Sequence, residues 1–152
     1  EQLSDLKPRT RLREDPLFLA AILAAPLVWL LLYFILRPEL DWSWPLYHPA
    51  HFLWPVLFFP VVEEILFRGL LQEFVRDYFS KDMLGPISIA NLVTSLVFTG
   101  LHFFYQPALW AALVFIPSLV FGFFKDRTGR LTAPIILHMF YNFGFLWVFS
   151  AP

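Results

Sequence analysis

The chain has 152 residues, of which 59% are hydrophobic and 20% aromatic, and its mean hydropathy is +0.64. Charged residues make up only 15% of the chain, against about 25% in soluble domains, which excludes an ordinary soluble domain. The net charge is −1 and the apolar region holds no basic cluster, so we expect no nucleic-acid partner. Because cysteine is absent, disulfides, thiolate nucleophiles and Cys-based metal sites are excluded too.

The apolar residues form runs long enough to cross a bilayer. Residues 1–16 mix basic and acidic side chains and are predicted to be a solvated, cytoplasmic lead-in. Leu17 to Leu36 has no charge over twenty residues and predicts a transmembrane helix. The next segment, Arg37 to Ala50, is predicted to be an interfacial loop, with Trp42, Trp44 and Tyr47 at headgroup level. Four further apolar segments follow: Phe52–Phe79, Ile87–Tyr105, Leu109–Phe124 and Leu131–Phe149. The fold class expected is all-α, a polytopic transmembrane helix bundle of about five spans in contact with the lipid bilayer.

The distribution of basic residues predicts the orientation of these spans. With the N-terminus inside, nine of the eleven Lys and Arg residues lie on the inner side, Lys81 among them. Arg37 lies on the outer side and Arg68 within a span. We therefore expect a cytoplasmic N-terminus and an exoplasmic C-terminus.

Three charged residues lie in the middle of the second apolar segment: Glu63, Glu64 and Arg68. On insertion scales they could together oppose membrane insertion by up to about 10 kcal/mol, so a compensating interaction is needed. On a helix, Glu64 and Arg68 lie four residues apart and can pair, whereas Glu63 points about 140° away from Arg68. The pair is predicted to brace the bundle while Glu63 stays available for chemistry. The alternative is an ion triad that only fixes helix packing.

Two further segments contribute polar side chains at helical spacing. One face of the third segment carries Asn91, Ser95, Phe98 and His102. In the last segment, His138 and Asn142 lie four apart and share a face. Each feature alone is also typical of helix packing. His102 could be a hydrogen-bonded packing residue and Phe98 an ordinary core residue, while His138 and Asn142 could form an interhelical hydrogen bond. Together they are nearly all the strongly polar groups at membrane depth, which favours one common site.

A polar site at membrane depth can be compared with the catalytic residues of known intramembrane enzymes. The residues that zinc, serine and aspartyl proteases need are not found in the expected patterns. No His-Glu-x-x-His string is present for a zinc site. Ser88, Ser95 and Ser118 have no Gly-x-Ser-x-Gly-like setting, and every Asp lies in a loop or at a helix end. The residues therefore permit a glutamate–histidine site.

With these residues the chain resembles the CPBP family. This family comprises the CAAX proteases and bacteriocin-processing enzymes, also called Abi proteins, and its members are glutamic-type intramembrane endopeptidases. Three family motifs match in order: Glu63-Glu64-x-x-x-Arg68, Phe98-x-x-x-His102 and His138-x-x-x-Asn142. The resemblance covers residues 52–149, the family's four-helix core. Residues 17–152 are then a single transmembrane protease domain, in which 17–36 is an added helix.

Family membership implies roles for these residues. Glu63 would activate a water with help from His102, while His138 and Asn142 would stabilise the oxyanion; Glu64, Arg68 and Phe98 would support them. No cofactor is implied. A zinc ion held by Glu63, Glu64, His102 and His138 is disfavoured because Arg68 lies beside Glu64.

The resemblance also implies a membrane-anchored peptide or protein substrate. Members cleave prenylated CAAX C-termini, mature or export peptides, or C-terminal sorting anchors. We expect cleavage near a C-terminal or transmembrane anchor, in a prokaryotic plasma membrane. Two alternatives are a non-proteolytic immunity or scaffold protein and a proton-coupled transporter, for which buried Glu and His are equally natural.

Overall fold

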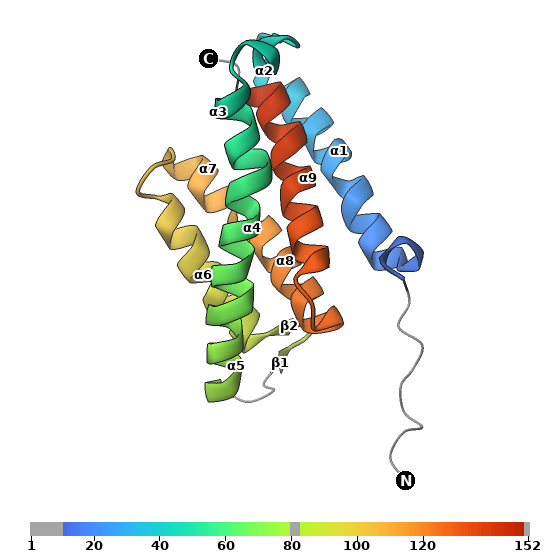
Figure 1. The fold of residues 1–152 in the computed structure, drawn as a ribbon, viewed down its shortest axis with the longest axis vertical. Helices are drawn as coiled ribbons and strands as arrows, with labels where there is room; N and C mark the ends of the chain where they lie inside the picture. Colours follow the sequence, from blue (N-terminus) through green and yellow to red (C-terminus); the bar gives the residue numbers. More distant parts are fainter. Residues whose placement is uncertain (1–10, 80–82, 151–152) are drawn as a thin grey trace.

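The computed structural model describes residues 11–79 and 83–150. Residues 1–10 of the predicted lead-in, and Lys81 of the predicted inner loop, lie outside the described residues. Figure 1 shows the helices lying side by side as a bundle, with α1 slanting along one flank.

Helices account for most of the described chain. The α-helices are α1 (Pro16–Leu36), α2 (Trp44–Tyr47), α3 (Pro49–Leu53), α4 (Phe59–Glu64), α5 (Gln72–Phe79), α6 (Ile89–His102), α7 (Ala108–Leu113), α8 (Phe115–Thr128) and α9 (Thr132–Phe149). Two π-helical segments, Trp54–Phe58 and Ile65–Leu71, join α3, α4 and α5 into one continuous helical run, and a 3-10 turn, Leu12–Glu14, precedes α1. Strands β1 (Met83–Leu84) and β2 (Ile87–Ser88) pair antiparallel, with Met83 opposite Ser88.

Four of these helical runs are long and apolar enough to span a membrane within the described residues: Pro16–Leu36, Pro49–Phe79, Ala108–Thr128 and Thr132–Phe149. The all-α transmembrane bundle is therefore confirmed. The third predicted span is shorter than expected, because α6 has 14 residues and rises only about 21 Å, less than the roughly 30 Å of a bilayer core.

Local signals in the sequence fix the ends of several helices. The Asp15 carboxylate accepts a hydrogen bond from the Leu17 amide (3.0 Å) and caps α1, and Pro16 occupies the first turn. Ser88 caps α6 in the same way through the Asn91 amide (3.0 Å). Helix α8 ends at Thr128 and is followed by Gly129, whose φ of +66° is a left-handed conformation that glycine adopts without strain.

The added helix α1 packs against α9. Gly144 allows this approach, because a Cβ there would lie 2.2 Å from the Trp29 ring. The Tyr141 hydroxyl donates to the Ala21 carbonyl (2.9 Å). The apolar core beneath α1 consists of Phe18, Phe121, Phe124, Ala133 and Leu137. Helix α1 is therefore a docked part of the bundle.

The predicted interfacial loop, Arg37 to Ala50, is partly wrong, because it contains α2 and the first two residues of α3. Trp42 and Tyr47 are exposed, as expected. Trp44 is instead buried, stacks edge-on against Phe52 and donates its indole N–H to the Trp147 carbonyl (3.1 Å). The physical reason is that α2 folds back onto the end of α9, which gives the indole both an apolar pocket and an acceptor.

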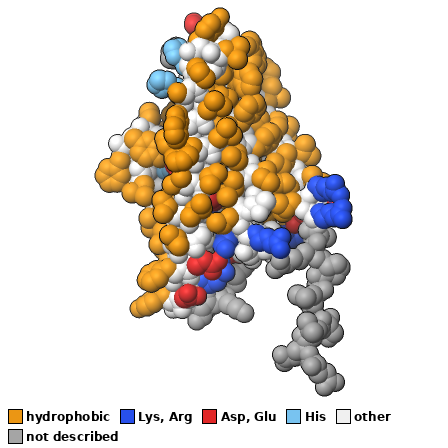
Figure 2. Space-filling view, in the orientation of Figure 1, with side chains coloured by type: hydrophobic (Ala, Val, Ile, Leu, Met, Phe, Trp, Pro, Cys, Tyr) orange, Lys and Arg blue, Asp and Glu red, His pale blue; other side chains and the backbone are white. Residues whose placement is uncertain are grey.

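Basic side chains gather at one end of the molecule. On the face shown in Figure 2, Lys and Arg side chains lie where α5 and α8 end and α1 and α9 begin. There Arg127 donates to the Asp15 carboxylate (2.9 Å), and this hydrogen bond, with the Leu17 cap, lowers the pKa of Asp15 despite its burial. The clustering agrees with the predicted segregation of charge, while the direction of insertion stays a prediction.

Candidate active site

Glu64 lies at the centre of the buried polar cluster, at the end of α4. Its side chain is fully buried, with Oε2 3.3 Å from Nε of Arg68. Its other oxygen, Oε1, lies 2.8 Å from Nδ1 of His138 on α9. The predicted Glu64–Arg68 pair is confirmed, and Glu64 in addition joins the first motif to the last.

Arg68 is fully buried as well and fixes this cluster to α8. Its Nη2 atom donates to the Ser118 carbonyl (2.9 Å) and to the Ser118 hydroxyl (2.7 Å). The guanidinium also lies over the rings of Phe98 and Phe121, 4.7 and 5.5 Å from their centroids. Carboxylate, hydroxyl, carbonyl and two aromatic faces thus surround the charge, which offsets the cost of burying it.

Glu63 lies in different surroundings from its neighbour. Its side chain is 27% exposed, and its Oε2 atom lies 3.6 Å from Nε2 of His138. Because Nδ1 of His138 faces the Glu64 carboxylate, that nitrogen carries a proton, and Nε2 is the atom presented to Glu63. The imidazole of His138 stacks on Phe121, at 4.8 Å and 19°, which holds the ring in this orientation.

His102 ends α6 and is buried against its own helix. Its Nδ1 atom lies 2.8 Å from the Phe98 carbonyl, which can only accept, so Nδ1 is the donor and Nε2 is free to accept when the ring is neutral. The rings of Phe98 and Tyr105 flank the imidazole at 4.5 and 5.1 Å. Between these described residues, no hydrogen bond or ion pair joins His102 to Glu63.

Asn142 is half-buried, one turn beyond His138. Its Nδ2 atom donates to the Pro55 carbonyl (2.8 Å), in the π-helical segment Trp54–Phe58. An amide nitrogen has two hydrogens, so this bond fixes the side chain and leaves one donor without a partner among the described residues. The structure therefore brings all three motifs into one cluster, but it joins Asn142 to a backbone carbonyl rather than to His138.

The sequence did not predict the contacts of several residues in this cluster. Ser118 was considered only as a nucleophile, whereas it accepts a hydrogen bond from Arg68. Phe121 and Pro55 carry no sequence signal for their contacts. Tyr105 lies in the turn after α6, and its ring flanks the imidazole of His102 at 5.1 Å.

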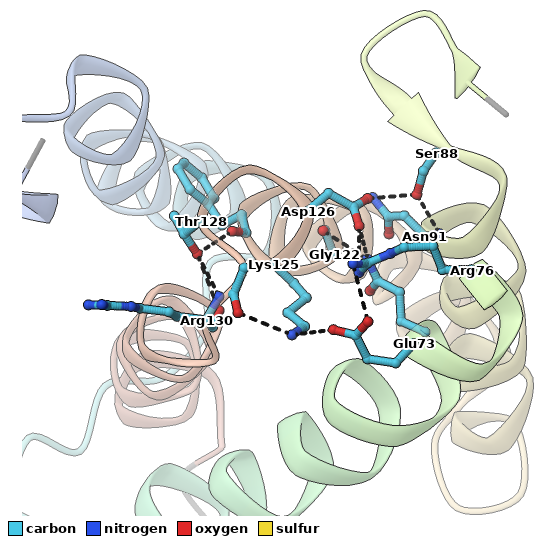
Figure 3. A network of polar contacts seen from close by, with 12 residues as sticks. Glu73, Arg76, Ser88, Asn91, Gly122, Lys125, Asp126, Thr128 and Arg130 are labelled. Atoms are coloured by element: carbon cyan, nitrogen blue, oxygen red, sulfur yellow. Dashed lines mark hydrogen bonds and ion pairs between the residues drawn. The ribbon is translucent and has the colours of Figure 1, made fainter. Parts of the chain in front are cut away.

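A ladder of polar contacts leads from Arg68 to the basic end of the bundle. Figure 3 shows the part of it nearest that end, around Gly122, Arg76 and Asp126. Its three pairs are Arg68 with Ser118, Gln72 with Gly122 and Arg76 with Asp126, and each step is four residues on both helices. The Asp126 carboxylate also accepts from Gln72 (2.8 Å) and from Ser88 (2.6 Å). The ladder sets the rotation of the helix that carries Glu63 and Glu64.

Asn91 ties α6 into the same ladder. Its Nδ2 atom donates to the Leu119 carbonyl (2.9 Å), and its Oδ1 atom accepts from the Ser95 hydroxyl (3.1 Å). Gly122 is required at this point, because a Cβ on it would lie 1.9 Å from Oδ1 of Asn91. The predicted buried face of α6 is confirmed, since Asn91, Ser95, Phe98 and His102 are all buried.

Comparison with known proteins agrees with this arrangement. The family described as type II CAAX prenyl endopeptidase Rce1-like matches residues 44–144, which is more than half of the chain and includes all three motifs. The chain is an integral membrane protein of an endopeptidase family. It belongs to the type II CAAX prenyl endopeptidase Rce1-like family, which is consistent with the resemblance to CPBP proteins.

One curated relative matches part of the chain. An uncharacterized 24.3 kDa protein of Escherichia coli is 35% identical over 80 residues, which are 53% of this chain and 35% of that protein. The match thus spans about a third of the relative's length. No solved structure matches the chain.

Proposed function

We propose that the chain is a glutamic-type intramembrane endopeptidase that cleaves a membrane-anchored polypeptide near its C-terminal or transmembrane anchor. The observation that carries the proposal is the position of Glu63. Its carboxylate is partly accessible and lies 3.6 Å from a histidine whose other nitrogen contacts the buried Glu64–Arg68 pair. A base beside an oriented imidazole, in a water-poor site, is the arrangement that general-base hydrolysis needs.

In the proposed reaction, the Glu63 carboxylate takes a proton from a water molecule as the water oxygen attacks the substrate carbonyl carbon. The resulting tetrahedral intermediate carries the negative charge on the former carbonyl oxygen. Glu63 then passes the proton to the amide nitrogen, the C–N bond breaks, and a carboxyl and an amine product leave. The free Nε2 of His102 would accept the second hydrogen of the water and orient it.

The oxyanion would be held by Asn142 and His138. Asn142 has one amide hydrogen left after its bond to Pro55. His138 can donate from Nε2 only when both ring nitrogens carry protons, because Nδ1–H already faces Glu64. The proposal therefore requires a doubly protonated His138 between two carboxylates during the attack.

The proposed mechanism uses no metal. Both Glu64 oxygens already contact other groups, Arg68 and His138, and the buried guanidinium opposes a dication by its charge. We expect activity to survive a chelator. Purified protein with stoichiometric zinc, whose activity is lost on chelation and restored by zinc, would contradict this mechanism.

The substrate class follows from the family and from the depth of the site. We propose a prenylated C-terminal peptide or another anchored tail as substrate, with the chain in a prokaryotic plasma membrane. Membrane proteins from cells with the active chain and with Glu63→Ala should differ by one or more tails that are cut only by the active form. Mass spectrometry of these tails gives the scissile bond, and a farnesylated peptide tests the prenyl requirement directly.

A non-proteolytic scaffold is the second candidate, because the fully buried Glu64–Arg68 pair and the polar ladder also serve packing. The two functions differ in what Glu63→Gln does. A scaffold keeps its biological activity with this substitution, whereas a protease loses it.

A further inference from the structure

A cavity outside the candidate active site lies at the basic end of the bundle, with a volume of about 590 Å³. Its walls come from the chain entering α1, from the turn after α8 and from the first residues of α9; among them are Arg11, Asp15, Arg127, Arg130, Thr132 and Ala133. The volume lies in the range of small-molecule sites. The three segments belong to three different spans, so an occupant would contact all of them.

The charge of this cavity is positive. It has three arginines and one aspartate, and Arg127 is paired with Asp15 at 2.9 Å. Within residues 11–79 and 83–150, neither Arg11 nor Arg130 takes part in an ion pair, and both are exposed. Figure 3 shows the Arg130 side chain extending away from the polar ladder. Two guanidinium groups at the cavity therefore have no carboxylate partner among the described residues.

Backbone donors add to this charge at the start of α9. Leu131, the residue before the helix, provides no capping side chain. The amides of Thr132 and Ala133 belong to the first turn, whose N–H groups have no acceptor within the helix. The positive end of the helix dipole and these free N–H groups favour an anion, in addition to the two arginines.

The depth of the cavity indicates where that anion comes from. Helix α1 begins at Pro16, α8 ends at Thr128 and α9 begins at Thr132, and each belongs to a predicted membrane span. The cavity thus lies at the level where three spans leave the bilayer core, which is the level of the lipid phosphates. Figure 2 shows the basic side chains at this end and an apolar surface beyond it.

We propose that this cavity binds the headgroup of an anionic phospholipid, with Arg11 and Arg130 contacting the phosphate and the start of α9 donating to it. Basic pockets between transmembrane helices bind such headgroups through the same chemistry. The bound lipid bridges the entry of α1 to the turn between α8 and α9. It thereby stabilises the docking of α1 against the core that includes Phe121, the residue on which His138 stacks.

The test uses the full chain purified in an uncharged detergent. Melting temperature and bound lipid, by native mass spectrometry, are measured with phosphatidylglycerol, with phosphatidylcholine and with inorganic phosphate at equal phosphorus concentration. The test variant is R11Q/R130Q. The control is R13Q/R37Q, which removes the same charge from two arginines that do not line the cavity.

The expected result is that phosphatidylglycerol raises the melting temperature of the wild type and of the control, and that its affinity falls about tenfold or more in R11Q/R130Q. Stabilisation by inorganic phosphate alone to the same degree would overturn the lipid as the source of the anion. Equal effects of the two lipids, or an unchanged response of R11Q/R130Q, would overturn the site itself. The single variant R130Q provides a second measurement of lipid affinity. Arg130 forms no ion pair among the described residues, so the substitution breaks no ion pair that stabilises the fold.

Discussion

The two adjacent glutamates divide the site into a closed half and an open half. On the closed side, Glu64 is fully buried and contacts Arg68 and His138, and Arg68 continues into Ser118 and the polar ladder. On the open side, Glu63 is 27% exposed, and its one ion pair among the described residues is with His138, at 3.6 Å. The comparison shows how one helix can carry a rigid brace and an accessible base at consecutive positions, because neighbouring residues point about 100° apart.

This difference has a physical use in catalysis. A base must be held in place before the reaction but must not be neutralised by a strong partner. The closed half provides the rigidity, through contacts to α8 and α9. The open half keeps one carboxylate free to exchange a proton with water. Substitutions in each half should therefore affect different measurements.

The largest expected effect is on the open side. Glu63→Gln should lower the rate of peptide cleavage by about 10² to 10⁴, because the amide cannot accept a proton from water. The melting temperature in detergent should stay near that of the wild type, since Glu63 makes no short contact among the described residues. The control is Glu73→Gln, the same change at a half-exposed carboxylate paired with Arg76 and Lys125. Retained cleavage by Glu63→Gln would assign the base to another residue.

On the closed side, Glu64→Gln should act on stability first. It leaves Arg68 as a buried charge without its counter-ion, a loss of about 3 to 5 kcal/mol in unfolding free energy. Glu73→Gln breaks a partly exposed pair with Arg76 and a pair with the buried Lys125, whose ammonium keeps a contact to the Gly129 carbonyl (3.5 Å). Its loss should therefore exceed that of a surface pair, which is under about 1 kcal/mol, but stay below that of Glu64→Gln. Unfolding in detergent followed by fluorescence compares the two. A wild-type melting temperature for Glu64→Gln would show that the pair does not brace the bundle.

The third prediction concerns Asn142, which bonds to Pro55 and keeps one donor. Asn142→Ala should reduce kcat by about 10² to 10³ with little change in KM, because an oxyanion donor acts mainly in the transition state. Asn91→Ala is the control, since Asn91 also donates to a backbone carbonyl, but in the ladder. It should lower stability and reduce kcat far less than Asn142→Ala does, because Asn91 acts on the site only through the ladder. A rise in KM with normal kcat would make Asn142 a substrate-positioning residue.

Helical periodicity predicted the contacts that lie within one helix. The four-residue spacing of Glu64 and Arg68 predicted that they pair, and the polar pattern on α6 predicted which face of this helix is buried. The gathering of three motifs was expected from the scarcity of polar groups at membrane depth, and the structure brings them together. The catalytic roles assigned to Glu63, His102, His138 and Asn142 stay predictions.

Contacts between distant segments were not predictable in this way. Arg68 to Ser118 and Gln72 to Gly122 each join residues 50 apart, and nothing local to either residue indicates its partner. Trp44 was expected at headgroup level because aromatic residues are common there, but that tendency does not indicate that the ring packs against Phe52. The length of α6 depends on the hairpin before it and the turn after it, which hydropathy does not resolve.

The smallest expected effect is on stability, at Gly122. Comparing two glycine-to-alanine substitutions separates the steric effect on the ladder from the general effect of alanine on helix stability. Gly122→Ala should cost about 1 to 3 kcal/mol, because the new Cβ would lie 1.9 Å from Oδ1 of Asn91 and must displace that side chain. Gly100→Ala on α6 is the matched control: nothing lies within 4 Å of its added Cβ, so the better helix former should stabilise by up to about 1 kcal/mol. If the ladder orients Glu63 and Glu64, Gly122→Ala should also lower kcat, whereas Gly100→Ala should not. Equal stability changes at the two glycines would mean that Asn91 can move aside freely. An unchanged kcat in Gly122→Ala, despite a loss of stability, would mean that the ladder packs the helices without orienting the site.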